Sequence, residues 1–377
     1  MLELGLGLKR LGHEVVAVCR DFTPGSDLAD AFARAFEVRS VAAPPPPPRG
    51  PLAPERHTWA AMRATAALVP AVDAVNAHEF PALRAGRMAA GRLGVPFVWT
   101  RNDETLFERA VIPDETTIAP RDGRERAIHG LVGLADLADA RRAAAVVVLD
   151  RRNARMVRRA YRRGARIIRS GPARAFFDAP DRGAARARLG VAPGAFLVLA
   201  FGVLFPYRRL EDLVDAVALD GDPATRLLLV GSDHAAPAYA DALEARIAER
   251  GLAGRAELRR TSVTDAELRE AYAAADAFVF PNLRQTWGLA PLEALASGTP
   301  VVVSRGAGVH EVLEGHPGVT VVDPCAPAQL ARALAELRAD PDRRAALAPT
   351  RAWIADALSN DRYAADMAAL LAEVGAR

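Results

Sequence analysis

The stretch of residues 280–303 decides the fold, and it reads FPNLRQTWGLAPLEALASGTPVVV. Its pattern predicts the end of a strand, a polar loop, a helix opened by Gly288 and Pro291, a tight turn and a second strand. A helix that begins beneath a glycine-containing loop presents free backbone N–H groups, which suit a phosphate. Because Gln285 falls in the loop and Glu293 falls just inside the helix, the stretch predicts a ligand site as well as a strand–helix–strand unit.

Outside this stretch, strand-like runs alternate with helical patterns along the whole chain. The helical patterns carry apolar residues at three- and four-residue spacing, as in Leu210–Leu219 and Tyr239–Glu249. This alternation predicts an α/β protein with parallel sheets covered by helices on both faces, and the runs are numerous enough for two sheets. The strand-like runs are Glu14–Val18, Ala71–Asn76, Phe97–Thr100, Ala145–Leu149, Arg166–Arg169, Phe196–Phe201, Arg226–Val230, Ala256–Arg259, Ala277–Phe280, Pro300–Val303 and Val319–Val322.

A domain boundary is expected near Gly171–Pro193, where turn-rich sequence separates one strand-like run from the next. We therefore expect an N-terminal domain over residues 1–172 and a C-terminal domain over residues 173–351. Pro44–Pro48 predicts a polyproline II spacer within a loop of the first domain.

The composition of the chain is that of a globular protein. Of its 377 residues 51% are apolar, in short runs that do not reach the roughly 18 residues of a membrane-spanning helix. The basic pair Lys9-Arg10 follows the first apolar stretch, which is unlike a secretory signal peptide. Cys19 and Cys325 are too few for a metal site and favour a reducing, cytoplasmic compartment. A net charge of +3 gives no indication of a nucleic-acid partner.

A second informative stretch, residues 201–213, reads FGVLFPYRRLEDL and runs from an expected strand into an amphipathic helix. Arg208 and Arg209 fall at the junction of loop and helix, where their forked donors suit a diphosphate. Fixed cations there would neutralise the negative charge that develops on a departing diphosphate. The simpler interpretation is a solvated pair of arginines at a helix start.

The two stretches together resemble the retaining glycosyltransferases of family 4. Residues 280–303 resemble the donor-binding signature of that family, in which two acidic residues stand eight positions apart. Glu293 supplies the second, and the amide Gln285 replaces the first. The resemblance covers essentially the whole chain and is most specific over Phe196–Pro324.

Residues 201–213 resemble the Gly-Arg-Leu…Lys-Gly pattern of the same family, with departures. Val203 stands in place of the first arginine, Arg208 in place of the lysine, and Arg209 in place of the glycine. Relative to the family pattern, one cation is lost and one is relocated.

The resemblance implies the GT-B fold, in which two Rossmann-like domains face each other across a cleft and a C-terminal helix, here within about residues 352–377, crosses back to the first domain. It implies transfer of a hexose-like group from a nucleotide-diphosphate sugar to a hydroxyl of a glycan, lipid or small metabolite, with retained anomeric configuration. In the implied front-face mechanism, the leaving phosphate helps to deprotonate the acceptor. No metal and no other cofactor is implied, since arginine and helix-dipole charge take the place of a metal.

The resemblance also implies roles for single residues. Asn102 stands where the family commonly has a histidine that contacts the donor sugar, and it begins the Asn102-Asp103-Glu104 run at the carboxyl end of a strand, where open α/β sheets bind ligands. The implied groups are Gly202, Arg208, Arg209, Gly288 and Leu289 for the diphosphate, Glu293 for the ribose, Gln285, Thr286 and Trp287 for the sugar, and Gln285, His78, Asn102 and Asp103 for catalysis.

Simpler interpretations of these residues remain open. Glu293 is also what the macrodipole favours near a helix start, Gln285 is also an ordinary loop residue, and His78 is also a buried, hydrogen-bonded histidine.

The start of the chain differs from that of the family. Leu2–Leu11 resembles the first helix, so the family's first strand and loop are absent, through a misassigned start or a truncation. We expect an exposed apolar sheet edge, with poor solubility or activity. Restoring upstream-encoded residues without any change in stability or turnover would contradict this expectation.

Two further hypotheses concern partners and activity. The basic segment Arg151–Arg163 predicts a helix that contacts an anionic membrane or a phosphorylated acceptor, or that is simply a solvated face. The alternatives to a transferase are a non-catalytic nucleotide-sugar-binding subunit and a GT-B epimerase or hydrolase, for which Asp103 with His78 would form the acid/base pair.

Overall fold

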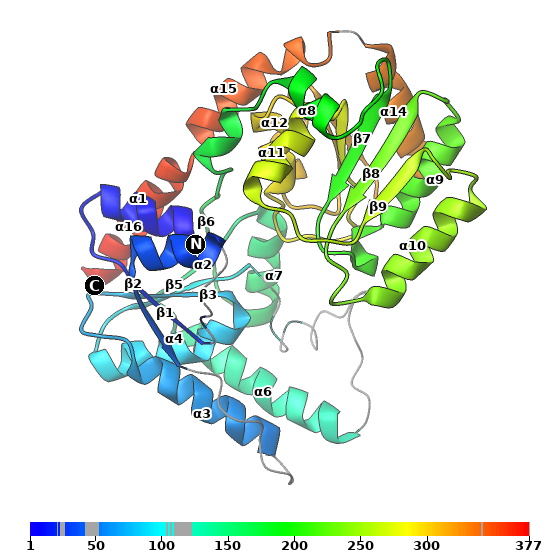
Figure 1. Cartoon of the computed structure of the whole chain (residues 1–377). Coiled ribbons are helices and arrows are strands. Elements are labelled where there is room, and N and C mark those ends of the chain that lie inside the picture. The colour runs from blue at the N-terminus through cyan, green and yellow to red at the C-terminus, as the bar shows by residue number, and fades with distance from the viewer. Residues whose placement is uncertain are drawn as a thin grey trace. The chain divides into compact units, whose positions relative to one another are not determined.

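The computed structural model divides into two compact units (Figure 1). Unit 1 comprises Met1–Arg169 and Asp361–Arg377, and unit 2 comprises Ser170–Asn360. The structure describes residues 1–20, 22, 27–41, 53–102, 105, 108, 123–340 and 342–376. The predicted spacer Pro44–Pro48 lies outside these residues.

Unit 2 is built on one six-stranded parallel sheet with the order β12-β11-β10-β7-β8-β9. Alternate residues of the central strands pack against α9, α10 and α14 on one face, and Phe278 stacks edge-on against Tyr272 of α11 on the other. The elements are α8 (Arg182–Arg188), β7 (Phe196–Phe201), α9 (Leu210–Asp220), β8 (Thr225–Val230), α10 (Pro237–Glu249), β9 (Ala256–Arg259), α11 (Asp265–Ala274), β10 (Ala277–Phe280), α12 (Ala290–Ala296), β11 (Val301–Ser304), α13 (His310–Leu313), β12 (Val319–Val322), α14 (Pro327–Ala339) and α15 (Ala348–Ala357).

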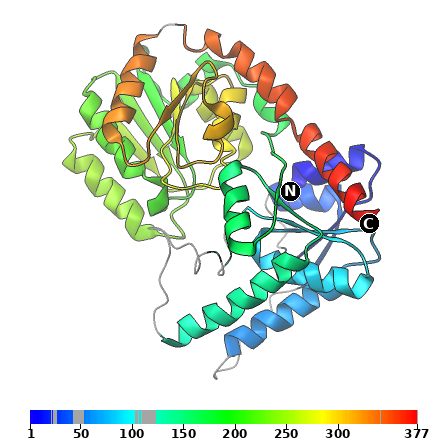
Figure 2. The same cartoon turned by 180° about the vertical axis from the view of Figure 1, so that it is seen from behind.

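The described residues of unit 1 form two parallel sheets, one of β1-β2 and one of β3-β4-β5-β6. The larger sheet packs one face against α4, α6 and α7 and the other against α1 and α16, the first and last helices of the chain (Figure 2). The elements are α1 (Leu2–Arg10), β1 (Val16–Arg20), α2 (Asp27–Ala35), β2 (Glu37–Val41), α3 (Ala53–Ala67), β3 (Val75–His78), α4 (Glu79–Leu93), β4 (Phe97–Thr100), α6 (Gly123–Arg142), β5 (Ala145–Val148), α7 (Arg151–Tyr161), β6 (Arg166–Ile167) and α16 (Asn360–Gly375).

The predicted α/β architecture with parallel sheets is confirmed, and every predicted strand has a counterpart. The bounds predicted for Ala71–Asn76 are wrong, because pairing with Phe97 starts β3 at Val75. Strand β2 was missed, because its sequence EVRSV is largely polar and gives a weak strand signal.

The single C-terminal helix predicted within about residues 352–377 is wrong as one helix, because that range holds the end of α15 and the whole of α16. The chain breaks at Leu358, whose carbonyl lies against the backbone of Gly171; a Cβ at Gly171 would lie 1.4 Å from that oxygen. Asn360 at the start of α16 also donates to the carbonyl of Pro172 at 3.0 Å. The close backbone contact at Gly171 therefore explains why one continuous helix does not form. Within the described ranges, no helix has the length and apolar character needed to cross a bilayer.

Candidate functional site

The carboxyl ends of β7 and β10 form the centre of the candidate site in unit 2. The two strands are parallel neighbours, so their ends meet at one edge of the sheet, where open α/β sheets bind ligands. A crevice too narrow to hold a water molecule lies at this edge, lined among others by Gly202, Arg208, Phe280 and Asn282. Two predicted diphosphate residues, Gly202 and Arg208, therefore lie together.

The guanidinium of Arg208 is held between aromatic rings. Its Cζ lies 5.2 Å from the ring centroid of Tyr207 and 5.6 Å from that of Phe280. A Cβ at residue 202 would lie 3.1 Å from the same Cζ, so Gly202 leaves room for the guanidinium. Burial lowers the pKa of Arg208, and its buried Nε has no hydrogen-bond partner. The side chain of Tyr207 bonds to this guanidinium, and among the described residues no carboxylate forms an ion pair with it, so its charge is not neutralised by an acid.

Arg209, by contrast, is held by acidic neighbours. It donates from Nε and Nη2 to Asp212 at 2.9 and 2.7 Å and forms a further ion pair with Glu211 at 2.9 Å. These bonds raise the pKa of Arg209. Its φ of 53° places it in the left-handed region that the family's glycine would adopt without strain. The structure therefore gives the two predicted arginines different surroundings, and only Arg208 lines the crevice.

The loop that carries Gln285 is fixed by its backbone. Gln285 N–H donates to Gly306 O, and Gly308 N–H donates to Gln285 O, both at 3.0 Å. A Cβ at residue 306 would lie 2.2 Å from Asn282 O, so only glycine permits this approach. The side chain of Asn282 donates to Gln285 Oε1 at 3.4 Å. The predicted sugar contact is therefore carried on a rigid loop next to the crevice.

Trp287, a predicted sugar-binding residue, is an anchor of this loop. Its side chain is 2% exposed, and its Nε1 donates to Ser170 O at 3.1 Å. Its backbone carbonyl accepts Val309 N–H at 3.0 Å. Thr286 before it is half-buried, and Leu289 after it is 39% exposed, so these two residues face solvent more openly than Trp287 does.

Glu293 lies in α12 with a fully buried tyrosine beside it. The hydroxyl of Tyr272 donates to Glu293 Oε2 at 3.3 Å. Burial raises the pKa of Glu293 to about 7, with a smaller contribution from the charge of Asp265. Sequence reasoning missed Tyr272, although it falls on the predicted helix before β10, because its phenol looks like one more core aromatic group.

The carboxyl ends of β3 and β4 carry the candidate residues of unit 1. Asn76 bridges the two strands: its Oδ1 accepts Thr100 Oγ1 at 2.9 Å, and its Nδ2 lies 3.0 Å from His78 Nε2. Asn102 donates from Nδ2 to Glu79 Oε1 at 2.7 Å. The predicted residues His78 and Asn102 thus stand at adjacent strand ends, whereas Asp103 lies outside the described residues.

Two features of this polar group were not predicted. Burial, and next to it the charge of the α-amino group, lowers the pKa of His78 to about 4, so its imidazole is neutral at ordinary pH. Glu79 has a φ of 69°, which is rare for a residue with a side chain and costs about 1–3 kcal/mol. Such strain is found most often where a ligand is bound.

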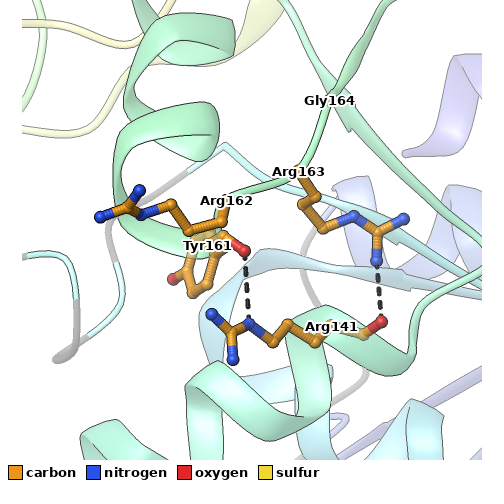
Figure 3. Close-up of a pocket in the computed structure, with 5 residues that line it drawn as sticks. All are labelled: Arg141, Tyr161, Arg162, Arg163 and Gly164. Atoms are coloured by element: carbon orange, nitrogen blue, oxygen red, sulfur yellow. Dashed lines mark hydrogen bonds between the residues drawn. The ribbon is translucent and has the colours of Figure 1, made fainter.

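The predicted basic helix is α7, which begins after the N-cap Asp150. Its outer face exposes Arg155, Arg158, Arg159 and Arg162. A hollow of about 470 Å³ lies at its C-terminal end (Figure 3).

The arginines that line this hollow act mainly as helix caps. Arg163 Nη1 donates to Ala140 O at 2.7 Å and to Ala143 O at 2.8 Å, at the end of α6, and Arg141 donates to Tyr161 O at 3.4 Å, at the end of α7. Their guanidinium groups do not converge on one point in Figure 3. The hollow is therefore explained by mutual capping of two helix ends.

The described residues contain no group of three or more His, Cys, Asp or Glu side chains arranged to hold a metal ion.

Comparisons with known proteins agree with these observations. Residues 1–171 match the family model described as Glycosyltransferase Family 4, and residues 181–351 match Glycosyl transferases group 1. The chain is 31% identical over 314 residues to a D-inositol 3-phosphate glycosyltransferase of Streptomyces bingchenggensis, covering 80% of this chain and 66% of that protein. It is 30% identical over 348 residues to the same-named protein of Acidothermus cellulolyticus, covering 88% and 74%. The chain thus spans about two thirds to three quarters of the length of these relatives.

Solved structures share the fold. Sucrose-phosphate synthase from Thermosynechococcus elongatus superposes with a TM-score of 0.77 at 22% identity, covering 99% of this chain and 92% of that one. Anabaena Alr3699/HepE in complex with UDP and glucose gives a TM-score of 0.74 at 18% identity, covering 98% and 95%. At these identities the likeness establishes the GT-B fold alone.

Proposed function

The chain belongs to the glycosyltransferases of family 4, and on this premise we propose that it transfers a sugar from a nucleotide-diphosphate sugar to an acceptor hydroxyl with retention of anomeric configuration. The observation that carries the proposal is Arg208, a cation without an acidic partner among the described residues, in the crevice at the carboxyl edge of unit 2. A cation fixed there before the reaction stabilises the charge that develops on a departing diphosphate.

The other donor contacts follow from the same edge. Gly202 makes room for Arg208 and lets a phosphate approach the backbone. Glu293, in its ionised form, accepts hydrogen bonds from the ribose hydroxyls. Gln285 contacts hydroxyls of the transferred sugar through an amide that both donates and accepts. Arg209 contributes less than Arg208, because its donors already serve Asp212 and Glu211.

The proposed chemistry needs no separate protein base. The bond between the anomeric carbon and the diphosphate oxygen breaks, the acceptor oxygen bonds to the same face of that carbon, and the acceptor proton moves to the departing phosphate. No metal or other cofactor takes part in this proposal, since Arg208 supplies the positive charge at the diphosphate.

The acceptor is proposed to bind at the polar group of unit 1. This group offers Asn76, Asn102, the carboxylate of Glu79 and the neutral imidazole of His78, a set that suits hydroxyls. The relatives named for D-inositol 3-phosphate suggest a phosphorylated cyclitol or sugar as the acceptor class. The exposed arginines of α7 are the proposed contact for a phosphate or an anionic membrane surface at a cytoplasmic location.

A non-catalytic sugar-nucleotide-binding role is the second candidate, favoured by one observation. Gln285 places a neutral amide where the family has a carboxylate, which removes a negative charge beside the developing oxocarbenium ion. Binding of a donor without release of nucleoside diphosphate would establish this alternative.

A two-step experiment tests the proposed function. UDP-glucose, GDP-mannose, ADP-glucose and dTDP-glucose are first screened by thermal shift, because a ligand of the native state raises its apparent stability. The donor that binds is then incubated with candidate acceptors, among them inositol phosphates, and the products are identified by mass spectrometry. Release of nucleoside diphosphate with a new glycoside supports the proposal, and no stabilisation by any donor contradicts it.

A further inference from the structure

A buried ion pair joins Arg101 to Glu108, two residues that follow β4 in the sequence. Arg101 donates from Nε and Nη2 to the carboxylate of Glu108 at distances of 2.8 to 3.0 Å. The two side chains are almost completely shielded from solvent, at 1% and 0% exposure. Glu108 Oε2 also accepts the backbone N–H of Thr105 at 3.0 Å. The carboxylate of Glu108 therefore holds both the side chain of Arg101 and the backbone of Thr105.

Arg101 and Thr105 are attached to opposite ends of α7. At the start of the helix, Arg101 Nη1 donates to Asn153 Oδ1 at 2.5 Å, and the backbone N–H of Asn153 donates to the N-cap Asp150. At its end, the hydroxyls of Thr105 and Tyr161 share a hydrogen bond of 2.6 Å. All five side chains are buried. Two attachment points about a helix length apart fix the positions of Arg101 and Thr105 relative to α7.

Asn102, the residue after Arg101, belongs to the polar group at the strand ends. Its Nδ2 donates to Glu79 Oε1 at 2.7 Å, whereas the side chain of Arg101 donates to Asn153 of α7 and to Glu108. We propose that Arg101 and Glu108 are positioning residues that hold the Asn102 amide toward a hydroxyl-bearing substrate in unit 1. The inference rests on the proposed transfer reaction.

Stability alone does not account for such a pair. An apolar pair of similar volume often stabilises a protein as well as a buried ion pair does. A guanidinium fork, however, fixes the direction of its partners, which apolar contact does not. Small displacements of a substrate-contacting group lower turnover strongly. Precise placement of Asn102 is therefore the property that the ion pair supplies.

Selective labelling tests the placement directly, without reference to activity. The chain has five asparagines, Asn76, Asn102, Asn153, Asn282 and Asn360, so protein labelled with ¹⁵N-asparagine gives few side-chain amide signals. Asn102→Ala assigns the signal of Asn102. In the full-length double variant Arg101→Met with Glu108→Leu, this signal is expected to shift and broaden, while those of Asn282 and Asn360 in unit 2 stay in place.

A matched control separates positioning from general loosening of unit 1. Arg84 is also buried and pairs with Asp136 and Asp139 between α4 and α6, and none of these ion pairs includes Asn102 or its partner Glu79. Arg84→Met with Asp136→Leu should leave the Asn102 signal unchanged. If the Arg101/Glu108 double variant fails to fold, Arg101→Lys, which keeps the charge and loses the fork, takes its place, and Arg84→Lys then serves as the control.

Turnover of the donor that binds in the thermal-shift panel completes the test. The Arg101/Glu108 variant and Asn102→Ala should each lower kcat/KM about tenfold. A variant that combines all three substitutions should lower kcat/KM little further, because all three act through the Asn102 amide. Affinity for the nucleoside diphosphate, which binds unit 2, should change less than about twofold.

An unchanged Asn102 signal, additive losses, or an equal loss in the Arg84 control would overturn the inference. If no donor binds the wild-type protein, the proposed function fails, while the Asn102 signal still decides the positioning role.

Discussion

The carboxyl edges of the two units differ in charge and in how they are built. In unit 2, a single continuous sheet ends in glycine turns that fix the cation Arg208 over aromatic rings. In unit 1, where the described strands form two separate sheets, the edge carries amides, a neutral imidazole and the carboxylate of Glu79.

This difference is the basis for proposing that unit 2 binds the phosphates of the donor and unit 1 the hydroxyls of the acceptor. A positive, rigid edge suits phosphates, whose charge must be met by fixed donors. A neutral or negative edge with many donors and acceptors suits hydroxyls. Each substitution below alters one edge and should leave the ligand of the other edge largely unaffected.

The largest effect is expected at Arg208. Arg208→Met should weaken nucleoside diphosphate binding about 100-fold and lower turnover about 1000-fold, because it removes charge-assisted hydrogen bonds to the leaving group. Titration calorimetry with the nucleoside diphosphate and steady-state rates measure the two effects.

Arg209→Gly is the matched control. It removes a neighbouring cation but relieves a left-handed backbone, so binding should change less than about threefold. Equal losses in the two variants would contradict the distinction between the arginines.

A smaller effect, with a pH dependence, is expected at Glu293. Glu293→Gln should weaken donor binding about tenfold at pH 8, where the native carboxylate is ionised and accepts from the ribose. Because the pKa of Glu293 is raised to about 7, wild-type affinity should fall as the pH drops through 7, and that of the variant should not. Binding isotherms at pH 6, 7 and 8 measure both curves.

Stability gives an independent check on Glu293. Its pKa in the native state lies above the usual 4.5, so between about pH 4.5 and 7 the native state binds more protons than the unfolded chain. The contribution of Glu293 to the free energy of unfolding therefore falls as the pH rises through that range, and it is lowest above pH 7. Glu293→Gln should be the more stable protein at pH 8, by on the order of 2 kcal/mol. Identical thermal unfolding curves would contradict the raised pKa.

Gln285 should show a separation between binding and turnover. Gln285→Glu should change donor affinity less than about threefold, because either group accepts hydrogen bonds from sugar hydroxyls. Turnover should rise, because a carboxylate stabilises a developing oxocarbenium ion better than an amide does. A loss of binding above about tenfold would show that the amide donor is essential.

The smallest effect is expected at His78 and concerns unit 1 alone. Its native pKa of about 4 lies below the usual 6.5, so between these values the unfolded chain binds more protons. The contribution of His78 to the free energy of unfolding is therefore fully present above pH 6.5, and it is lost as the pH falls toward 4. Between pH 7 and pH 5 the free energy of unfolding should fall less in His78→Gln than in the wild type, by about 1–2 kcal/mol. Thermal unfolding at both pH values measures this, and nucleoside diphosphate affinity should be unaltered.

More of the candidate site could be predicted from the sequence in unit 2 than in unit 1, for a physical reason. Arg208 follows β7 and Gly202, and Gln285 and Glu293 lie on either side of Gly288 between β10 and β11, so a local pattern reveals all three. Even there, the acids that hold Arg209 were not recognised, although Asp212 stands at the i+3 position. A local sequence pattern predicts where a charged side chain lies, but it does not predict which residue that side chain pairs with.

The contacts of unit 1 have no local pattern of that kind. Arg101 meets Asn153 from 52 residues away, and Thr105 meets Tyr161 from 56 residues away. Neither spacing has a period, so only the folded chain brings these groups together. The positive φ of Glu79 is equally invisible in the sequence, because glutamate gives no indication of a left-handed backbone.

The close-packed glycines of unit 2 have an evolutionary consequence. A Cβ at Gly231 would lie 1.9 Å from Gly202 O, and one at Gly306 would lie 2.2 Å from Asn282 O, so a side chain at either position collides with backbone. In a lineage that lost catalysis but kept the fold, selection on Gln285 would relax, while both glycine codons would persist. Retention of these glycines in distant descendants would therefore indicate that the fold is inherited, and the residue at position 285 would indicate whether a lineage kept catalysis.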